Sequence, residues 1–346
     1  MTDFRSDNTL GCSPEIVDAL ARAGSGALSP YGNDEITASL RARCRDLFET
    51  DLEILPVLTG TGGNSLAIAT MTPPWGAVFC HEDAHIYRDE LGAPEFFTEG
   101  AKLIPIAGEH GKIRPEVLER AIHDIGDTKR MAIPACLSLT NATEAGTVYS
   151  AGETRALCEV AHRFNMGVHV DGARFANALV STGCSLAELT WKAGVDMLIF
   201  GATKNGAMAA ELIVVFKPAM MEQLRYRWHR SGHRLSKMRF LSAQLDAYLT
   251  SDLWLRNARN ANAMAARIRE GIQGIAGVEI LRPVDANILL LRFSPAILAE
   301  LRGAGFLFYD WEIFGPGAVR LVTGFSTTGT EVDALLEAIR GVARVE

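Results

Sequence analysis

Short apolar runs alternate with amphipathic stretches between residues 50 and 216. This alternation is typical of an open sheet whose parallel strands are connected by helices that cover its faces. We therefore expect an α/β fold whose large domain has a mostly parallel seven-stranded sheet flanked by helices. The expected strands are Glu53–Leu58, Ala77–Cys80, Lys102–Ile106, Met131–Leu137, Gly167–Asp171, Val195–Phe200 and Glu211–Phe216.

A polar arm and a short helix precede the sheet. We expect the arm at Phe4–Thr9. Ser13 then offers a capping side chain and Pro14 suits the first turn of a helix, which we expect to end at Gly24.

A change of pattern follows the last expected strand. From Lys217 the chain is helical and basic through Arg239, and it then predicts one long helix to about Gly271. The remainder predicts a compact α+β unit. Its expected strands and helices are Val278–Leu281, Ala286–Phe293, Pro295–Gly303, Phe306–Tyr309, Ala318–Thr323 and Thr330–Val342. We divide the chain into an N-terminal arm (1–15), a large domain (16–245) and a small C-terminal domain (246–346).

Composition excludes several classes of protein. The 346 residues hold 34 Lys and Arg against 41 Asp and Glu, so no global basic field gathers nucleic acid or anionic lipid. The basic stretch 225–239 has little aromatic interleaving, and it fits either a neighbouring subunit's phosphate site or a solvated helix face. The charged start is unlike a signal peptide and no apolar run is long enough to span a membrane, so we expect a cytoplasmic protein. Six scattered cysteines without a C-x-x-C pair predict neither a metal site nor a disulfide framework.

Three short segments carry the chemistry. Residues 59–64 (Thr-Gly-Thr-Gly-Gly-Asn) follow a strand and open a helical run at Ser65, so the segment is either an anion-binding cup or only a tight turn. Asp171 ends a strand, where open α/β sheets bind ligands, although it could instead cap the next helix and pair locally with Arg174. Lys204 follows another strand among small residues, as a nucleophilic amine or an exposed turn lysine would.

Together these segments meet the needs of one cofactor, pyridoxal 5′-phosphate. The cup holds the phosphate, the aspartate keeps the pyridine nitrogen protonated, and the lysine binds the aldehyde as a Schiff base. Cup, aspartate and lysine also occur in the order that a sheet-based site requires.

The chain resembles the low-specificity L-threonine aldolases, within the aspartate-aminotransferase-like enzymes of PLP fold type I, nearly from end to end. The resembling segments are Phe4–Asp7, Tyr31–Asp34, Gly60–Asn64, Ala84–Ile86, His169–Arg174, Thr203–Gly206 and Val319–Thr323. The family usually has Gly-Leu-Gly after the lysine, where this chain has Asn205-Gly206-Ala207. A Glu-Asn-Thr-His-Asn stretch of the family is replaced at 139–143, which bears on substrate preference.

The resemblance implies a role for each residue of the site. Lys204 and His85 are the catalytic residues, and His81 is a nearby rival to His85. The substrate carboxylate is bound by Ser6, Arg174 and Arg320, so the arm contributes to the active site. The cofactor contacts come from Gly60, Thr61, His85, Asp171, Arg174, Thr203 and Lys204.

The implied activity is reversible cleavage of L-threonine, L-allo-threonine or related L-β-hydroxy-α-amino acids, phenylserine among them, to glycine and an aldehyde. The implied assembly is a homotetramer with active sites at subunit interfaces. Two alternatives stay open: a PLP-dependent β-eliminating lyase acting on another amino acid, because the same fold and cofactor residues serve several reactions, and a noncatalytic PLP-binding protein.

Overall fold

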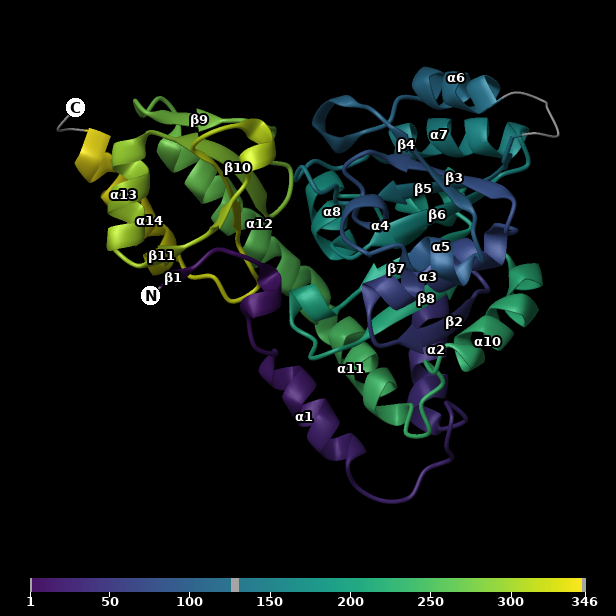
Figure 1. Cartoon of the computed structure of the whole chain (residues 1–346). Helices are drawn as coiled ribbons and strands as arrows, with labels where there is room; N and C mark the ends of the chain where they lie inside the picture. The colour runs from purple at the N-terminus through teal and green to yellow at the C-terminus, as the bar shows by residue number, and fades with distance from the viewer. Residues whose placement is uncertain (1, 126–130, 344–346) are drawn as a thin grey trace.

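The computed structural model describes residues 2–125 and 131–343 and contains a seven-stranded mixed sheet. The strand order is β2-β8-β7-β6-β5-β3-β4, and β8 is antiparallel to both neighbours while the remaining pairs are parallel. All seven expected strands and the mostly parallel sheet are therefore confirmed (Figure 1). The bounds are β2 (Glu53–Val57), β3 (Gly76–His81), β4 (Lys102–Ile106), β5 (Ile133–Thr140), β6 (Gly167–Gly172), β7 (Met197–Gly201) and β8 (Glu211–Val215).

Helices pack against this sheet, as its buried strands require. Helix α3 contacts β6, β7 and β8 and is buried continuously from Gly63 to Thr70, because small and apolar side chains surround its whole circumference. The helices between residues 35 and 189 are α2 (Glu35–Phe48), α3 (Gly60–Met71), α4 (His85–Arg88), α5 (Ala93–Phe97), α6 (Pro115–Ile125), α7 (Ala151–Arg163), α8 (Phe175–Thr182) and α9 (Leu186–Leu189).

The single long helix expected up to Gly271 is wrong. The basic helix α10 (Met221–Arg230) ends well before Arg239, and α11 (Arg239–Leu249) is separated from α12 (Leu253–Ile272) by a kink. At the kink Ser251 and Asp252 have left-handed φ angles of 49° and 55°. Short polar side chains tolerate this conformation and compete with helical backbone hydrogen bonds, a tendency that apolar periodicity does not reveal.

Helix α12 belongs to two hydrophobic cores. Trp254 and Ala258, near its start, are buried in the core of the large sheet. Ile268 and Ile272, near its end, are buried in the core of the C-terminal unit. The expected division at 245/246 therefore falls within α11, before the helix that joins the two cores, and we keep it as a proposal. Residues 1, 126–130 and 344–346 of the proposed domains lie outside the described residues.

The C-terminal unit is an antiparallel sheet with helices, so the expected α+β unit is confirmed. Its strand order is β12-β13-β10-β9. The expected strand Phe306–Tyr309 is instead two short strands, β11 and β12, in different sheets. The bounds are β9 (Val278–Ile280), β10 (Ile288–Phe293), β11 (Phe306–Leu307), β12 (Tyr309–Asp310), β13 (Ala318–Val322), α13 (Pro295–Gly303) and α14 (Gly329–Ala343).

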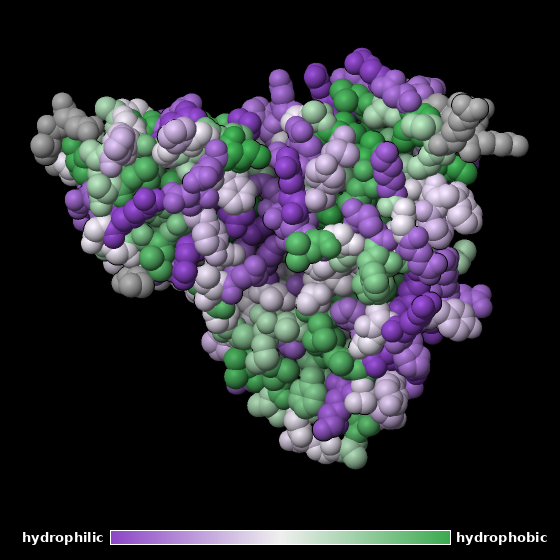
Figure 2. Space-filling model, viewed as in Figure 1, coloured by the Kyte–Doolittle hydropathy of each residue, from purple (hydrophilic) through white to green (hydrophobic). Residues whose placement is uncertain are grey.

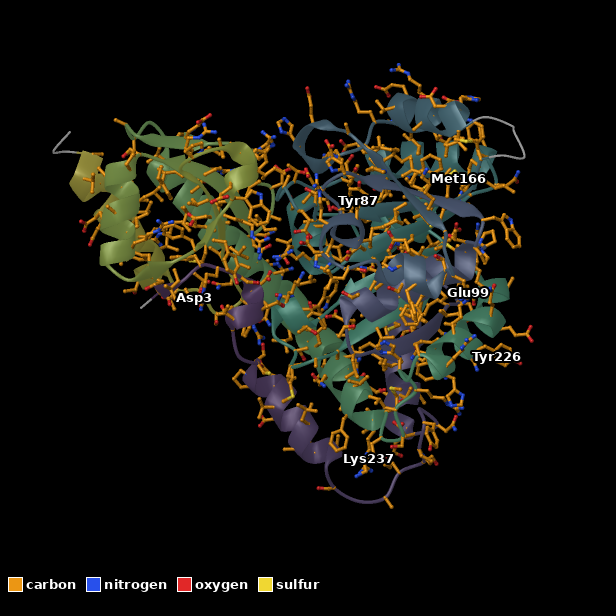
Figure 3. All side chains as sticks on the ribbon, in the orientation of Figure 1. Asp3, Tyr87, Glu99, Met166, Tyr226 and Lys237 are labelled. Carbon is orange, nitrogen blue, oxygen red and sulfur yellow. The ribbon has the colours of Figure 1, made fainter. Side chains whose placement is uncertain are left out.

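The N-terminal arm pairs with this unit. Strand β1 (Thr2–Asp3) lies parallel to β11, and Phe4 is buried against Phe306 with ring centroids 6.5 Å apart. Figure 3 shows Asp3 beneath the small domain. Helix α1 (Pro14–Ala23) ends at Gly24 as expected. At the start of the helix, the Ser13 side chain makes no capping hydrogen bond.

The surface combines polar regions with one gathered apolar area. Figure 2 shows apolar residues at the lower end of the molecule, where α1 and α11 lie in Figure 1. Val17 of α1 is 51% exposed. Within residues 2–125 and 131–343, no helix has the length and apolarity needed to cross a membrane.

Candidate active site

A cavity of about 240 Å³ opens at the carboxyl ends of β6 and β7, beside the start of α3. Ligands bind at this edge of open α/β sheets. The cavity brings together six of the expected residues: Gly60, Thr61, His85, Asp171, Thr203 and Lys204. It is also lined by residues that sequence reasoning did not single out, among them Asn64, Glu90 and Glu211.

The glycine-rich segment forms the first turn of α3, which begins at Gly60 and so five residues before Ser65. Thr59 caps the helix, and its hydroxyl accepts a hydrogen bond of 3.0 Å from the Gly62 backbone N–H. The first backbone N–H groups of a helix lack carbonyl partners within the helix, and its dipole favours an anion there. The segment is thus a helix N-terminus that faces the cavity, which favours the anion-cup interpretation.

His233 lies against this cup from the basic stretch. A Cβ atom placed on Gly62 would be 2.3 Å from its Nε2, so any larger residue at this position would displace the ring. The Leu58 backbone N–H donates to His233 Nδ1 at 3.3 Å, which places the proton of a neutral ring on Nε2. Burial lowers the pKa of His233, so the ring offers a neutral donor beside the cup of its own chain.

Asp171 is a buried carboxylate held by neutral donors. Its Oδ2 accepts from Asn64 Nδ2 at 3.1 Å and its Oδ1 accepts from the Ala173 backbone N–H at 3.0 Å. The local pair with Arg174 that the sequence allowed does not form, because the Arg174 guanidinium binds both carboxylate oxygens of Asp7, at 2.7 and 3.0 Å. Asp171 is therefore left facing the cavity.

Helices α11 and α12 hold the loop that carries Lys204 in place. Asn205 donates to the Tyr248 hydroxyl at 2.6 Å and to the Trp254 carbonyl at 2.8 Å. Gly206 has a φ of 110°, and a Cβ atom there would lie 2.4 Å from the hydroxyl oxygen of Ser13. Asn205 thus stands where the family has glycine because its amide connects the lysine loop to α11 and α12.

His85 is held by a buried chain of polar side chains. Its Nδ1 lies 2.9 Å from Glu90 Oε1, which also accepts from Asn64 Nδ2 at 2.9 Å. The hydrogen bond to Glu90 raises the pKa of His85 against the opposing effect of burial. His81 points elsewhere, to the carbonyl of Gly108 at 3.0 Å, and does not line the cavity.

Glu211 adds a second buried carboxylate to the cavity wall. Its Oε2 accepts from the Ala202 backbone N–H at 2.8 Å. Burial raises the pKa of Glu211 to about 7. Sequence reasoning missed Glu211, because the apolar pattern of a strand does not show which of its two ends faces a ligand.

The three residues expected to bind a substrate carboxylate differ in availability. The Ser6 hydroxyl accepts from the Asn8 backbone N–H at 3.1 Å, and Arg174 is paired with Asp7. Arg320 is half-buried, stacked 4.8 Å from the Trp311 ring centroid, and within the described ranges its buried Nε has no hydrogen-bond partner. Desolvation and the nearby Arg174 lower the pKa of Arg320. Of the two arginines, Arg320 is the one left free for a carboxylate.

These residues fit pyridoxal phosphate. A helix N-terminus suits the phosphate, the cavity-facing Asp171 suits a protonated pyridine nitrogen, and Lys204 supplies an amine between them. The buried Oε2 of Glu90 and Oδ1 of Asn64 also lack partners among the described residues, so the wall offers further acceptors. The side chains present match the group expected from the sequence.

Comparison with known proteins defines the class of this molecule. A model of the beta-eliminating lyase family matches residues 3–295, so the chain belongs to that family of lyases, and its expected cofactor, pyridoxal phosphate, is confirmed. Within it, the chain belongs with the low-specificity L-threonine aldolases. Proteins of that name from Pseudomonas sp. (strain NCIMB 10558) and Pseudomonas aeruginosa are 40% and 41% identical, over 99% and 98% of this chain and 99% of each relative.

Solved structures agree with this placement. The threonine aldolase of Leishmania major superposes with a TM-score of 0.93 at 27% identity, over 99% of this chain and 100% of the other. An aspartate aminotransferase from Rhodobacter sphaeroides, at 18% identity and a TM-score of 0.73 over 99% and 93% of the two chains, shows the same fold. The expected aspartate-aminotransferase-like fold is therefore confirmed.

Proposed function

We propose that this enzyme cleaves L-threonine, L-allo-threonine and related L-β-hydroxy-α-amino acids to glycine and an aldehyde, reversibly and with pyridoxal phosphate. The observation that carries the proposal is the convergence of Lys204, Asp171, His85 and the start of α3 on one cavity. The relatives named above as threonine aldolases support the choice of reaction.

The bound cofactor supplies an electron sink for the carbanion left when a bond to Cα breaks. Lys204 would hold the aldehyde of this group through its amine. Asp171, fixed by Asn64 and the Ala173 backbone, keeps the pyridine nitrogen protonated. The first turn of α3, with Gly60, Thr61 and His233, binds the phosphate, and Thr203 completes the cofactor contacts.

His85 removes the proton of the β-hydroxyl group. Since Nδ1 is engaged by Glu90, the unprotonated Nε2 is the base that remains for the substrate. Cleavage of the Cα–Cβ bond then converts the hydroxylated carbon to an aldehyde, and a proton added at Cα yields glycine. The chain thus provides a base and a cofactor site close together.

Arg320 binds the substrate carboxylate in a forked, two-bond contact, which suits a guanidinium whose Nε lacks a partner. Ser6 and Arg174 act beside it. Because both Arg174 nitrogen atoms in the pair already contact Asp7, we assign Arg174 mainly to fixing the arm that carries Ser6. The substrate is then held at its carboxylate by the small domain and the arm.

The cofactor and the products test the proposal. The purified enzyme should absorb near ~420 nm and release glycine with the matching aldehyde from L-threonine, L-allo-threonine or phenylserine. Lys204→Ala should lose the band and all turnover, and full activity in that variant would refute the mechanism. Mass spectrometry of the intact protein after borohydride reduction should show the cofactor on the parent enzyme and none on the variant.

The alternative reaction is β-elimination, which the name of the matching family model favours. It would release pyruvate and ammonia from an amino acid with a good leaving group. Pyruvate without aldehyde would overturn the aldolase reaction and leave the cofactor site intact. Complete lack of turnover over a broad amino-acid panel, with the absorption band present, would instead indicate a noncatalytic PLP-binding protein.

We further propose a cytoplasmic homotetramer with active sites at subunit interfaces. The six cysteines are all unpaired, as is usual in a reducing compartment. The apolar area over α1 and α11 is suited to a subunit contact. Light scattering of the purified protein should give four times the 37.5 kDa chain mass, and a monomer would contradict the assembly.

A further inference from the structure

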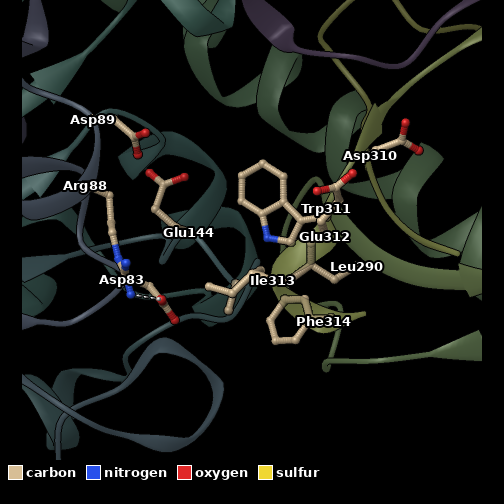
Figure 4. A pocket seen from close by; sticks show the side chains of 11 residues that line it. Asp83, Arg88, Asp89, Glu144, Leu290, Asp310, Trp311, Glu312, Ile313 and Phe314 are labelled. Carbon is tan, nitrogen blue, oxygen red and sulfur yellow. Dashed lines mark ion pairs between the residues drawn. The ribbon is translucent and has the colours of Figure 1, made fainter. Parts of the chain in front are cut away.

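A second cavity, of about 280 Å³, lies between the two domains (Figure 4). One wall comes from the large domain and carries Asp89 and Glu144. The other comes from the segment after β12 and carries Trp311, Glu312 and Phe314. We call this cavity the acidic cleft. The proposed function assigns no role to the residues that line it.

Unpaired carboxylates dominate the cleft. Two of its acidic residues are neutralised, Asp83 by Arg88 at 3.7 Å and Asp310 by Arg302. The other three, Asp89, Glu144 and Glu312, form no ion pair within the described parts of the chain. The cleft therefore offers three carboxylates with which a cationic ligand would pair.

Aromatic rings line the same space. Trp311 and Phe314 both border the cleft, and each has a guanidinium over its ring, Arg320 at 4.8 Å and Arg282 at 4.6 Å from the centroid. Ring faces attract cations, most strongly when the cation is desolvated. Aromatic faces and carboxylates together are the groups that recognise a substituted ammonium ion, whereas a methyl group gains only the apolar contact.

The cleft adjoins the position of the substrate. Trp311 contacts Arg320, the proposed carboxylate ligand. Glu144 is near enough for its charge to act on Arg320, Arg174 and also His85, the proposed base. A substrate held at Arg320 by its carboxylate and at His85 by its β-hydroxyl would direct its Cβ substituent toward this cleft.

We propose that the acidic cleft binds the substrate side chain and selects β-hydroxy-α-amino acids that carry an ammonium group at the far end. This inference rests on the proposed function and names a substrate class for it. The Cα–Cβ bond breaks, the hydroxylated carbon becomes the carbonyl of an amino aldehyde, the hydroxyl proton leaves to the base, and Cα gains a proton to give glycine.

The test compares two substrates that differ in one group. Glycine release is measured for 3-hydroxylysine and for 2-amino-3-hydroxyheptanoate, in which a methyl group replaces the ammonium. We expect kcat/KM to favour 3-hydroxylysine by about 10-fold, as for a cation between an aromatic face and a carboxylate. The preference should weaken in high salt, because the cleft is open to solvent.

Variants of the cleft carboxylates test whether these residues cause the preference for 3-hydroxylysine. Glu144→Gln and Glu312→Gln should each lower the ratio of the two kcat/KM values several-fold, roughly the weight of one partly exposed charge. Glu300→Gln, which removes an exposed carboxylate of α13 outside the cleft, should leave the ratio unchanged. Glu312 is exposed, so its variant keeps the test sound if Glu144→Gln folds poorly.

The outcomes separate this inference from the proposed function. A ratio of one or less with intact L-threonine cleavage would overturn the cleft proposal alone. A high ratio that neither cleft variant lowers would also overturn it, because the preference would then arise elsewhere. Loss of glycine release from every substrate, L-threonine included, would refute the proposed function and this inference with it.

Discussion

Glu90 shows how one buried side chain sets the chemistry of another. Its side chain is fully shielded from solvent, and one of its oxygens joins His85 to Asn64, which in turn contacts Asp171. The proposed base and the proposed pyridine partner therefore share one network. Such a carboxylate fixes both the protonated nitrogen and the orientation of the ring, as buried partners of functional histidines do.

Replacing this carboxylate should change the pH dependence of turnover. Glu90 raises the pKa of His85, so Glu90→Gln should lower that pKa. A base acts when unprotonated, and the acid side of the kcat profile should therefore move to lower pH while the maximal rate falls, by roughly 10-fold to 100-fold. Kinetics from pH 5 to 9 test this.

The matched control for that profile is Glu159→Gln, on the exposed face of α7, which should keep the parent profile. An acid limb that stays in place in Glu90→Gln would show that His85 does not take the proton.

Glu211 should make the protein less stable as the pH rises. Its pKa is about 7 in the folded protein because of burial, whereas an unfolded glutamate has its usual value near 4.5. Between these values the folded state binds more protons than the unfolded state, so the free energy of unfolding falls with rising pH. Glu211→Gln keeps an acceptor for the Ala202 N–H and should flatten this dependence.

Urea titrations of the cofactor-free protein at pH 5 and pH 7 measure the effect. The difference in unfolding free energy between the two pH values should be smaller in Glu211→Gln than in the parent protein. An equal difference would mean that Glu211 is ionised at both pH values.

Helix α3 is the element on which the cofactor site depends most. Its first turn is rich in glycine, which leaves room for the His233 ring beside Gly62 and for the phosphate that we propose there. The first turn remains stable because Thr59 caps the helix and the later turns are buried against the large sheet. The glycine-rich first turn of α3 thus has a low helix propensity, and the packing of the later turns offsets this loss of stability.

Gly62→Ala should weaken cofactor binding. The added methyl group would meet His233 Nε2 at 2.3 Å and push the ring from the cup. Loss of one hydrogen bond to a charged phosphate corresponds to at least about 1.4 kcal/mol, or a 10-fold higher Kd for pyridoxal phosphate. Fluorescence titration of the cofactor-free enzyme gives this Kd.

Gly152→Ala serves as the control, because its added Cβ meets only the Ser150 hydroxyl, at 3.9 Å. A Kd in Gly62→Ala equal to that of the control would remove His233 from the phosphate site.

Elements that depend on chain-local patterns were predictable, and contacts between distant segments were not. The strand Lys102–Ile106 and the helix Pro295–Gly303 match their expected bounds, because apolar runs and turn residues mark them. The break at Ser251 was missed, since apolar periodicity continues through it. Asp7 as the partner of Arg174, and Glu90 behind His85, were missed because both join residues through packing that no spacing records.

At the scale of the whole molecule, a buried ion pair joins the arm to the large domain. Asp7 and Arg174 come from the arm and the large domain, and their side chains are 1% and 4% exposed. Burial alone would raise the pKa of Asp7, but the charges of Arg174 and Lys204 keep it below its usual value. The pair therefore contributes stability at neutral pH that is lost only as the pH falls below the usual range of an aspartate.

Breaking the pair should destabilise the fold strongly. Asp7→Asn removes the hydrogen-bonded counter-charge of the buried Arg174 guanidinium, and breaking such a pair costs about 3–5 kcal/mol of unfolding free energy. Asp3→Asn breaks the partly exposed pair with Arg5 in the same arm and should cost less than about 1 kcal/mol. Urea denaturation at pH 7 compares them, and equal losses would contradict the importance of the Asp7 pair.

The pairing of β1 with β11 also constrains how the protein is made. Thr2 and Asp3 leave the ribosome before the large sheet is made, yet their partners Phe306 and Leu307 are synthesised about 300 residues later. The large sheet can form while the chain is still growing, as N-terminal regions generally do. The arm that carries Ser6 must wait until β11 has been made, so a newly made subunit acquires the proposed substrate site only after β1 and β11 have paired.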